Sequence, residues 1–265
     1  MTPEAQRILV TGGGTFLGDS IAAALLAEGA QVTLLVRPGA EDRLGPLAQR
    51  TRWFSADVWN PASLRGRSRG HAAVVHTVGS LTADLAQGLN HHWLNFVSAR
   101  NVASMCVSDG CPHIVLLSAA RAPWINRQYL QAKREAEDYV QRVGLRATII
   151  RAPLAYRRGW PRHPFFWLMT ALGSVPPTSW LGFGQAAPLP LDMLARGVAR
   201  IALDQPPHKL VHSARDLRRR STPREARRAA PSLADEARIR QQPVRPFDLL
   251  DEDAPFGWTP PKDRR

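Results

Sequence analysis

The feature that most constrains the fold of this chain is a run of glycines between a short β-branched segment and an apolar helical pattern. Residues 8–11 read Ile-Leu-Val-Thr, residues 12–14 are all glycine, and apolar residues at helical spacing follow over 16–26. Gly29 fits a helix stop, and a second buried strand is predicted over 32–36. The sequence therefore predicts a complete β-α-β unit close to the start of the chain.

The alternation of strands and helices continues along the chain. Further strands are predicted over 53–56, 72–77, 114–118 and 147–151. Helices are predicted over 94–107, over 127–143 with Asn126 as the cap and Gly144 as the stop, and over 191–203. Strands that alternate with crossover segments form parallel sheets with helices on both faces. We expect an α/β fold with a doubly wound, Rossmann-like parallel sheet.

The organisation becomes less regular after Arg151. We interpret residues 1–220 as one domain that includes a small, irregular substrate or docking region over about 152–215. Residues 221–265 are rich in Arg and Pro and form a C-terminal extension that is expected to be extended or partly disordered. Its segment 247–258 is acidic and aromatic, which is typical of either a docking segment or a solvated tail.

Composition narrows the class of protein and its setting. With 44% hydrophobic and 22% charged residues, the chain is globular as a whole. Cys106 and Cys111 make no disulfide framework, and their spacing relative to the histidines matches no zinc template, so no metal site is predicted. No secretion signal is visible at the amino terminus. A reduced, cytoplasmic setting is the expectation.

The formal net charge of +13 suggests an acidic partner, and much of it comes from arginines between 215 and 228. A compositional bias toward Arg explains the same charge. The basic stretch lacks interleaved aromatic residues and no nucleic-acid module is present, so nucleic acid is not the expected partner.

A second distinctive segment, residues 163–191, contains no Lys, Arg, Asp or Glu and is rich in Phe and Trp. Pro176 and Pro177 interrupt it, so a transmembrane helix is not expected. Aromatic core packing or an interfacial patch each explain it. In the second case the partner is a hydrophobic small molecule or a membrane protein complex, with peripheral contact to the membrane through 163–191.

The glycine run suits a nucleotide. Glycines after a first strand let the backbone approach a pyrophosphate, and the next helix offers unpaired N–H groups and a positive dipole end. Gly18 allows the helix to pack closely on the sheet. The residues expected to form this cradle are Gly12, Gly14, Thr15, Phe16, Leu17 and Gly18.

Two further positions bear on the identity of the nucleotide. The second strand ends in Val36-Arg37 rather than in an acidic residue, and a guanidinium there can pair with a 2′-phosphate. NADP(H) is therefore favoured over NAD(H), the alternative being a solvated arginine. Asp57-Val58 follows the third strand, where the carboxylate can accept from the adenine amino group or simply form a turn.

With these residues the chain resembles the extended and atypical branches of the short-chain dehydrogenase/reductase superfamily over about residues 6–215. It is most similar to the family of the NADPH-binding accessory subunit of respiratory complex I and its bacterial relatives. The resemblance implies that Thr77, Val78 and Gly79 line the cofactor, that Asn95 and Asn101 belong to the fourth helix, and that the Ala152-Pro153 backbone meets the nicotinamide carboxamide. The chain departs from the family turn at Thr15, which takes the place of the middle glycine.

The resemblance also identifies Ser118, Tyr129 and Lys133 as the superfamily's catalytic residues. Residues four apart on a helix share a face, so Tyr129 and Lys133 can face the same cleft. An ammonium beside a phenol is expected to lower the phenol pKa, and the hydroxyl can then exchange a proton with a carbonyl or alcohol during hydride transfer. Ser118 is expected to bind the same substrate oxygen.

Two functions remain open on the sequence. The first is an NADP(H)-dependent oxidoreductase on a hydrophobic carbonyl or alcohol, because the region after 152 offers aromatic rather than polar residues. The second is a non-catalytic, nucleotide-binding accessory or assembly subunit of a membrane-associated electron-transfer complex, as the resemblance implies.

Overall fold

A parallel sheet forms the centre of the protein. The computed structural model describes residues 5–85, 88–122, 125–156, 188–204 and 209–221. The main sheet has seven strands in the order β3-β2-β1-β4-β5-β6-β9, and every pair is parallel. The strands are β1 (Arg7–Gly13), β2 (Gln31–Val36), β3 (Arg52–Ser55), β4 (Ala73–His76), β5 (His113–Ala119), β6 (Arg146–Ala152) and β9 (Val211–His212).

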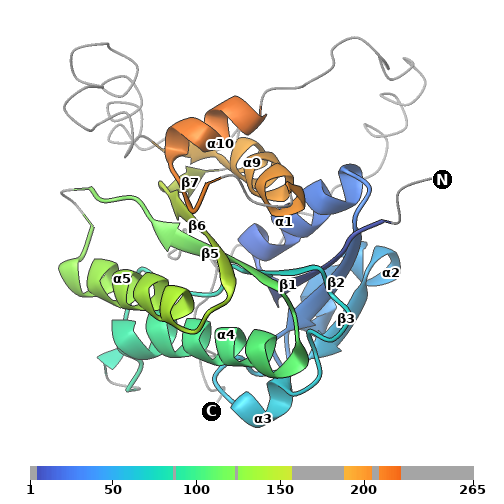
Figure 1. The fold of residues 1–265 in the computed structure, drawn as a ribbon, viewed down its shortest axis with the longest axis horizontal. Helices are drawn as coiled ribbons and strands as arrows, with labels where there is room; N and C mark the ends of the chain where they lie inside the picture. The colour runs from blue at the N-terminus through green and yellow to red at the C-terminus, as the bar shows by residue number, and fades with distance from the viewer. Residues whose placement is uncertain (1–4, 86–87, 123–124, 157–187, 205–208, 222–265) are drawn as a thin grey trace.

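Helices connect these strands and cover both faces of the sheet. They are α1 (Phe16–Ala27), η1 (Glu41–Leu44), α2 (Leu47–Arg50), α3 (Pro61–Leu64), η3 (His92–Val97), α4 (Ser98–Asp109), α5 (Arg127–Arg142), α9 (Leu191–Leu203) and α10 (Ala214–Ser221). A separate pair of short strands, β7 (Ala155–Tyr156) and β8 (Leu189–Pro190), leads into α9. Helices α1, α9 and α10 lie on one face of the sheet, and α3, α4 and α5 lie on the other (Figure 1).

Two apolar clusters hold the layers together. One joins β1 and β2 to α1 and α9, with Ile8, Ile21 and Val198 fully buried, and the other joins β4 and β5 to α4 and α5. Strand β5 is buried over its whole length, as expected of a strand covered on both faces. The prediction of a Rossmann-like α/β fold is thus confirmed.

The elements match the expected ones closely, with two additions at the end of the domain. Strand β9 extends the sheet by one position, and α10 packs on α9, where Gly197 lies against Leu217. The sequence predicted α9 over its observed bounds but predicted neither β9 nor α10. Within the region over about 152–215 that was expected to be irregular, α9, β9 and the start of α10 therefore contribute to the sheet and its helical layer.

One helix differs from its prediction. The helix expected over 94–107 begins earlier, with the π-helical segment η3, and continues as α4. Residues 163–187 of the uncharged segment and 222–265 of the C-terminal extension lie outside the described residues. Within the described ranges, no helix combines the length and the apolar character that crossing a bilayer requires.

Candidate functional site

The glycine turn lies at the carboxyl end of β1 and leads directly into α1. Gly12 and Gly14 have φ angles of 81° and 80°, a region that residues with a Cβ rarely adopt. A Cβ on Gly18 would overlap the carbonyl oxygen of Gly12. The close packing of helix on turn that the sequence predicts is therefore present.

Some backbone N–H groups of this turn are hydrogen-bonded within the protein, and others have no partner within the helix. Thr15 caps α1 by accepting from the Gly18 N–H at 3.2 Å, and Asp19 Oδ1 accepts from the Gly14 N–H at 2.9 Å. Phe16 and Leu17 are the first two residues of α1, so their N–H groups have no partner within the helix. These two amides are the donors that the turn can offer to a phosphate.

Asp19 is a member of this turn that the sequence analysis missed. Burial raises the pKa of its carboxyl to about 7, although the Gly14 N–H opposes the shift. A carboxyl with this pKa is partly neutral at physiological pH. Its position in the first turn of α1 was visible in the sequence, but nothing there indicated its hydrogen bond.

Two arginines lie on the side of the turn that faces β2 and η1. Arg37 directly follows β2, and the loop after it contacts the turn, since a Cβ on Gly14 would lie 2.8 Å from the Ala40 carbonyl oxygen and 3.5 Å from Arg43 Cβ. The sequence predicted Arg37 but not Arg43. Arg37 therefore lies at the carboxyl end of β2, and Arg43 lies against the turn at Gly14.

The loop after β3 is fixed by side chains from two directions. Asp57 Oδ1 accepts from the Trp59 N–H at 2.9 Å, as in a turn, while Asn101 Nδ2 donates to the Val58 carbonyl at 3.1 Å. Val58 is buried. Asn101 therefore positions the Asp57-Val58 pair. This geometry is compatible with both interpretations of Asp57, as a turn residue and as an adenine-binding residue.

The segment Thr77–Gly79 joins the glycine turn to α5. A Cβ on Gly12 would lie 2.6 Å from Thr77 Oγ1 and 3.3 Å from Val78 Cγ2. A Cβ on Gly79 would lie 2.5 Å from Asn95 Oδ1 and 2.6 Å from Lys133 Nζ. Three residues after β4 thus connect the nucleotide cradle to Lys133.

Tyr129 and Lys133 lie together on the buried face of α5. Lys133 Nζ is 5.9 Å from the centroid of the Tyr129 ring and donates to the Leu117 carbonyl at 3.3 Å. Burial lowers the pKa of Lys133 to about 8, against the opposing charge of Glu137. Burial raises the pKa of Tyr129, which is opposite to the shift expected from an ammonium neighbour. Burial outweighs the lowering by the nearby charge of Arg134.

Polar residues of η3 and β4 surround this pair. The Asn95 side chain bridges the N–H and C=O of Ser80 at 3.1 and 2.9 Å, and the π-helical turn turns Asn95 toward that loop. His91 meets the Tyr129 ring edge-on with centroids 6.0 Å apart. His76 is fully buried, and burial together with the Lys133 charge lowers its pKa to about 3.

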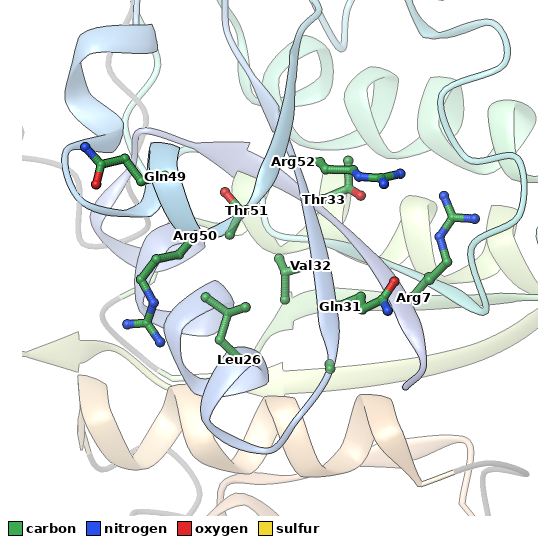
Figure 2. Close-up of a pocket in the computed structure, with 10 residues that line it drawn as sticks. Arg7, Leu26, Gln31, Val32, Thr33, Gln49, Arg50, Thr51 and Arg52 are labelled. Atoms are coloured by element: carbon green, nitrogen blue, oxygen red, sulfur yellow. The ribbon is translucent and has the colours of Figure 1, made fainter. Parts of the chain in front are cut away.

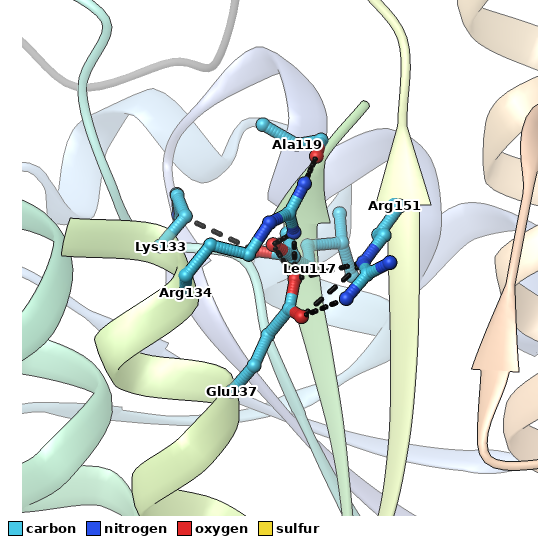
Figure 3. Close-up of polar contacts among 7 residues, drawn as sticks. Leu117, Ala119, Lys133, Arg134, Glu137 and Arg151 are labelled. Atoms are coloured by element: carbon cyan, nitrogen blue, oxygen red, sulfur yellow. Dashed lines mark hydrogen bonds and ion pairs between the residues drawn. The ribbon is translucent and has the colours of Figure 1, made fainter. Parts of the chain in front are cut away.

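Ser118 belongs to a polar network around Glu137. Figure 3 shows Arg134 and Arg151 meeting Glu137 in this network. Its hydroxyl donates to Glu137 and accepts from Arg134 Nη1 at 3.2 Å. Arg151 donates to Glu137 Oε2 at 2.6 Å, and Arg134 donates to the Ala119 carbonyl at 2.8 Å. The hydroxyl that was expected to bind substrate is therefore engaged inside the protein.

The structure gathers most predicted positions along the carboxyl edge of the sheet. Ala152 ends β6 and pairs with Ala119 at the end of β5, and the buried Pro153 follows it. The residues that the sequence analysis missed are Asp19, Arg43, His91, Arg134 and Glu137. Only Glu137 carried a usable signal, because it follows Lys133 by one helical turn on the same face. Among the described residues, no cluster of His, Cys, Asp or Glu could hold a metal ion.

Comparisons with known proteins agree with this arrangement. The model of a family described as NAD(P)H-binding matches residues 12–158. The Bordetella bronchiseptica enzyme WbmH, solved in complex with NAD+, is similar at 20% identity and TM-score 0.55, covering 76% of this chain and 73% of that one. A short-chain dehydrogenase/reductase from Serratia marcescens has 14% identity and TM-score 0.58, covering 79% and 95%. At such identities the likeness concerns the fold.

Proposed function

The chain belongs to the NAD(P)H-binding family, and from this premise we propose that it is an NADP(H)-dependent oxidoreductase acting on a hydrophobic carbonyl or alcohol. One observation carries the proposal. The segment Thr77–Gly79 contacts both the glycine turn at Gly12 and the amine of Lys133. A dinucleotide that begins on the turn and follows this segment brings its nicotinamide to Tyr129 and Lys133.

The residues present fit such a dinucleotide. The open N–H groups of Phe16 and Leu17 suit its pyrophosphate, and the glycines allow the tight turn that aims these groups, since a Cβ at Gly12, Gly14 or Gly18 would clash with neighbouring protein atoms. Arg37 and Arg43 favour a 2′-phosphate, hence NADP(H) over NAD(H). The Asp57-Val58 loop suits the adenine, and the Ala152-Pro153 backbone suits the carboxamide.

When bound, the nicotinamide supplies or accepts the hydride. The chain supplies the proton, and Tyr129 is the group placed to exchange it at the substrate oxygen. Lys133, held by the Leu117 carbonyl, keeps a positive charge over the phenol ring below its pKa of about 8. The substrate class rests on the sequence of 163–191, whose uncharged, aromatic character suits an apolar molecule.

A non-catalytic role is the second candidate, as a nucleotide-binding accessory subunit at a membrane-associated electron-transfer complex. Two observations favour it. Ser118 is committed to Glu137, and burial raises the pKa of Tyr129, which disfavours proton exchange at neutral pH. In that role the dinucleotide stabilises the fold, and the segment 163–191 or the C-terminal extension provides contact with the complex.

The experiment that separates these roles starts with freshly purified protein. The protein is denatured, released nucleotide is identified by mass spectrometry, and exchange with added NADPH is measured. Exchangeable NADPH and turnover of hydrophobic aldehydes or quinones support the enzyme. Tightly held, non-exchanging NADPH without turnover supports the accessory role.

The Tyr129→Phe variant tests the chemical role of the phenol. We expect turnover to fall by a factor of about 100 or more, with NADPH affinity kept, because only the proton donor is lost. Tyr139→Phe on the same helix is the matched control, since Tyr139 contacts Ser104 and not Lys133. Equal turnover in the wild type and Tyr129→Phe contradicts the catalytic proposal.

A further inference from the structure

A cavity of about 450 Å³ lies at the amino ends of β1, β2 and β3. Arg7, Gln31 and Arg52 are the first residues of these three strands, and all three line it. The glycine turn is at the opposite end of the same strands. Because β2 has 6 residues and a strand rises about 3.3 Å per residue, the two places are about 20 Å apart.

Three guanidinium groups surround this cavity, and no acidic residue lines it. Figure 2 shows Arg7 and Arg52 on one side of β2 and Arg50 on the other. Within the described part of the chain, none of the three arginine side chains forms a hydrogen bond or an ion pair. Arg7 and Arg52 share one side of β2, so their like charges repel each other and both favour an anion bound beside them, while Arg50 adds to the positive field from the other side.

Arg7 and Arg52 lie on the same face of the sheet, near Gly70 and His71. Thr33 pairs with Arg52 across the strands, as Gln31 does with Arg7, so these four residues share one face of the sheet. His71 fixes Thr33 through a 2.9 Å hydrogen bond. Arg7 Nη1 lies over Gly70, where a Cβ would be only 3.2 Å away.

The pKa of His71 also reflects the positive charge of Arg7 and Arg52. Burial lowers the pKa of His71, and the charges of Arg7 and Arg52 lower it further. Both guanidinium groups therefore act on the same imidazole. A neutral His71 adds no positive charge, and the field at this edge comes from the arginines.

We propose that this cavity binds a phosphate-bearing ligand at a site separate from the dinucleotide cradle. Arginine forks match phosphate oxygens in bidentate geometry, and polar side chains of Gln31, Gln49 and Thr51 add donors. Leu26, Ala30 and Val32 add apolar lining on the Arg50 side of the cavity, which suits an organic phosphate. The volume lies in the range of small-molecule sites.

Calorimetric titration of the full-length protein, saturated with NADPH at about 0.15 M ionic strength, tests this proposal. The probes are pyrophosphate, inorganic phosphate and phenyl phosphate. We expect saturable binding that the Arg7→Gln/Arg52→Gln double variant weakens about tenfold or more. Tighter binding of phenyl phosphate than of inorganic phosphate identifies an organic phosphate, and the reverse order identifies the free ion.

The matched control is Arg146→Gln. Arg146 is exposed and begins β6 at the same edge of the sheet, outside the cavity. Its loss should change affinity less than about twofold. Equal weakening in the control and the double variant means general attraction to a cationic protein and overturns the proposal, as does unchanged binding in the double variant. NADPH affinity, measured in the same variants, reports separately on the dinucleotide site.

Discussion

At the scale of the single residue, Asp19 links protonation to the glycine turn. Its folded pKa of about 7 is above the ordinary value of 3.8, so the native state holds a proton that the unfolded chain releases. The stability that this proton provides is complete below pH 3.8 and is lost as the pH rises through 7. We expect Asp19→Asn to flatten the decline in the free energy of unfolding between pH 4 and 8, measured by urea titration.

The same residue predicts a pH dependence of NADPH affinity. A bound pyrophosphate disfavours the charged carboxylate, so wild-type affinity should fall as the pH rises above about 7. Asp19→Asn should bind equally well at pH 6 and pH 8, while the exposed Asp42→Asn control should keep the wild-type profile. An identical profile in the wild type and Asp19→Asn contradicts this reading of the turn.

At the scale of the element, Glu137 attaches α5 to β5 and β6. Its carboxylate is buried and receives bonds from Arg134, Arg151 and Ser118, so removing it leaves two cations and a hydroxyl without their partner. We expect Glu137→Ala to lower the free energy of unfolding by about 3 kcal/mol. Urea titration measures this, with Glu135→Ala on the exposed side of the same helix as the control, expected to cost under about 1 kcal/mol.

Elements with strong local patterns were predictable, and those that depend on distant partners were not. Asn126 caps α5 as predicted, accepting from the Gln128 N–H at 2.8 Å. Strand β9 has 2 residues, too few for any periodicity, and pairs only because β6 offers an open edge. The π-helical turn around Asn95 leaves the apolar pattern unchanged. Ser118 was assigned to substrate by resemblance, and its bond to a carboxylate 19 residues away in sequence could not be predicted from local spacing.

In the candidate site too, the features set by local spacing were predictable and those set by long-range packing were not. The glycine turn and the Tyr129–Lys133 pair are local spacings, and the structure shows each in its expected element. The link through Gly79 and the engagement of Ser118 arise from packing between β4, β5 and α5. Spacing along one helix indicates which face a residue occupies, but not which of its neighbours takes its hydrogen bond.

At the scale of the whole molecule, the net charge of +13 acts on any dinucleotide that approaches. A 2′-phosphate adds negative charge where Arg37 and Arg43 flank the turn, so NADPH should bind about tenfold more tightly than NADH. Since a ligand at 100 times its Kd stabilises the native state by about 2.7 kcal/mol, the preference is measurable as a larger rise in Tm with NADPH than with NADH.

The double variant Arg37→Gln/Arg43→Gln separates local pairing from the general charge. If the two guanidinium groups pair with the 2′-phosphate, the variant loses the preference and gives equal Tm shifts with both dinucleotides. Arg50→Gln/Arg52→Gln removes the same charge at the amino edge of the sheet and should keep the preference. A preference that declines equally in both variants, and disappears with added salt, would show that long-range attraction by a cationic surface selects the cofactor.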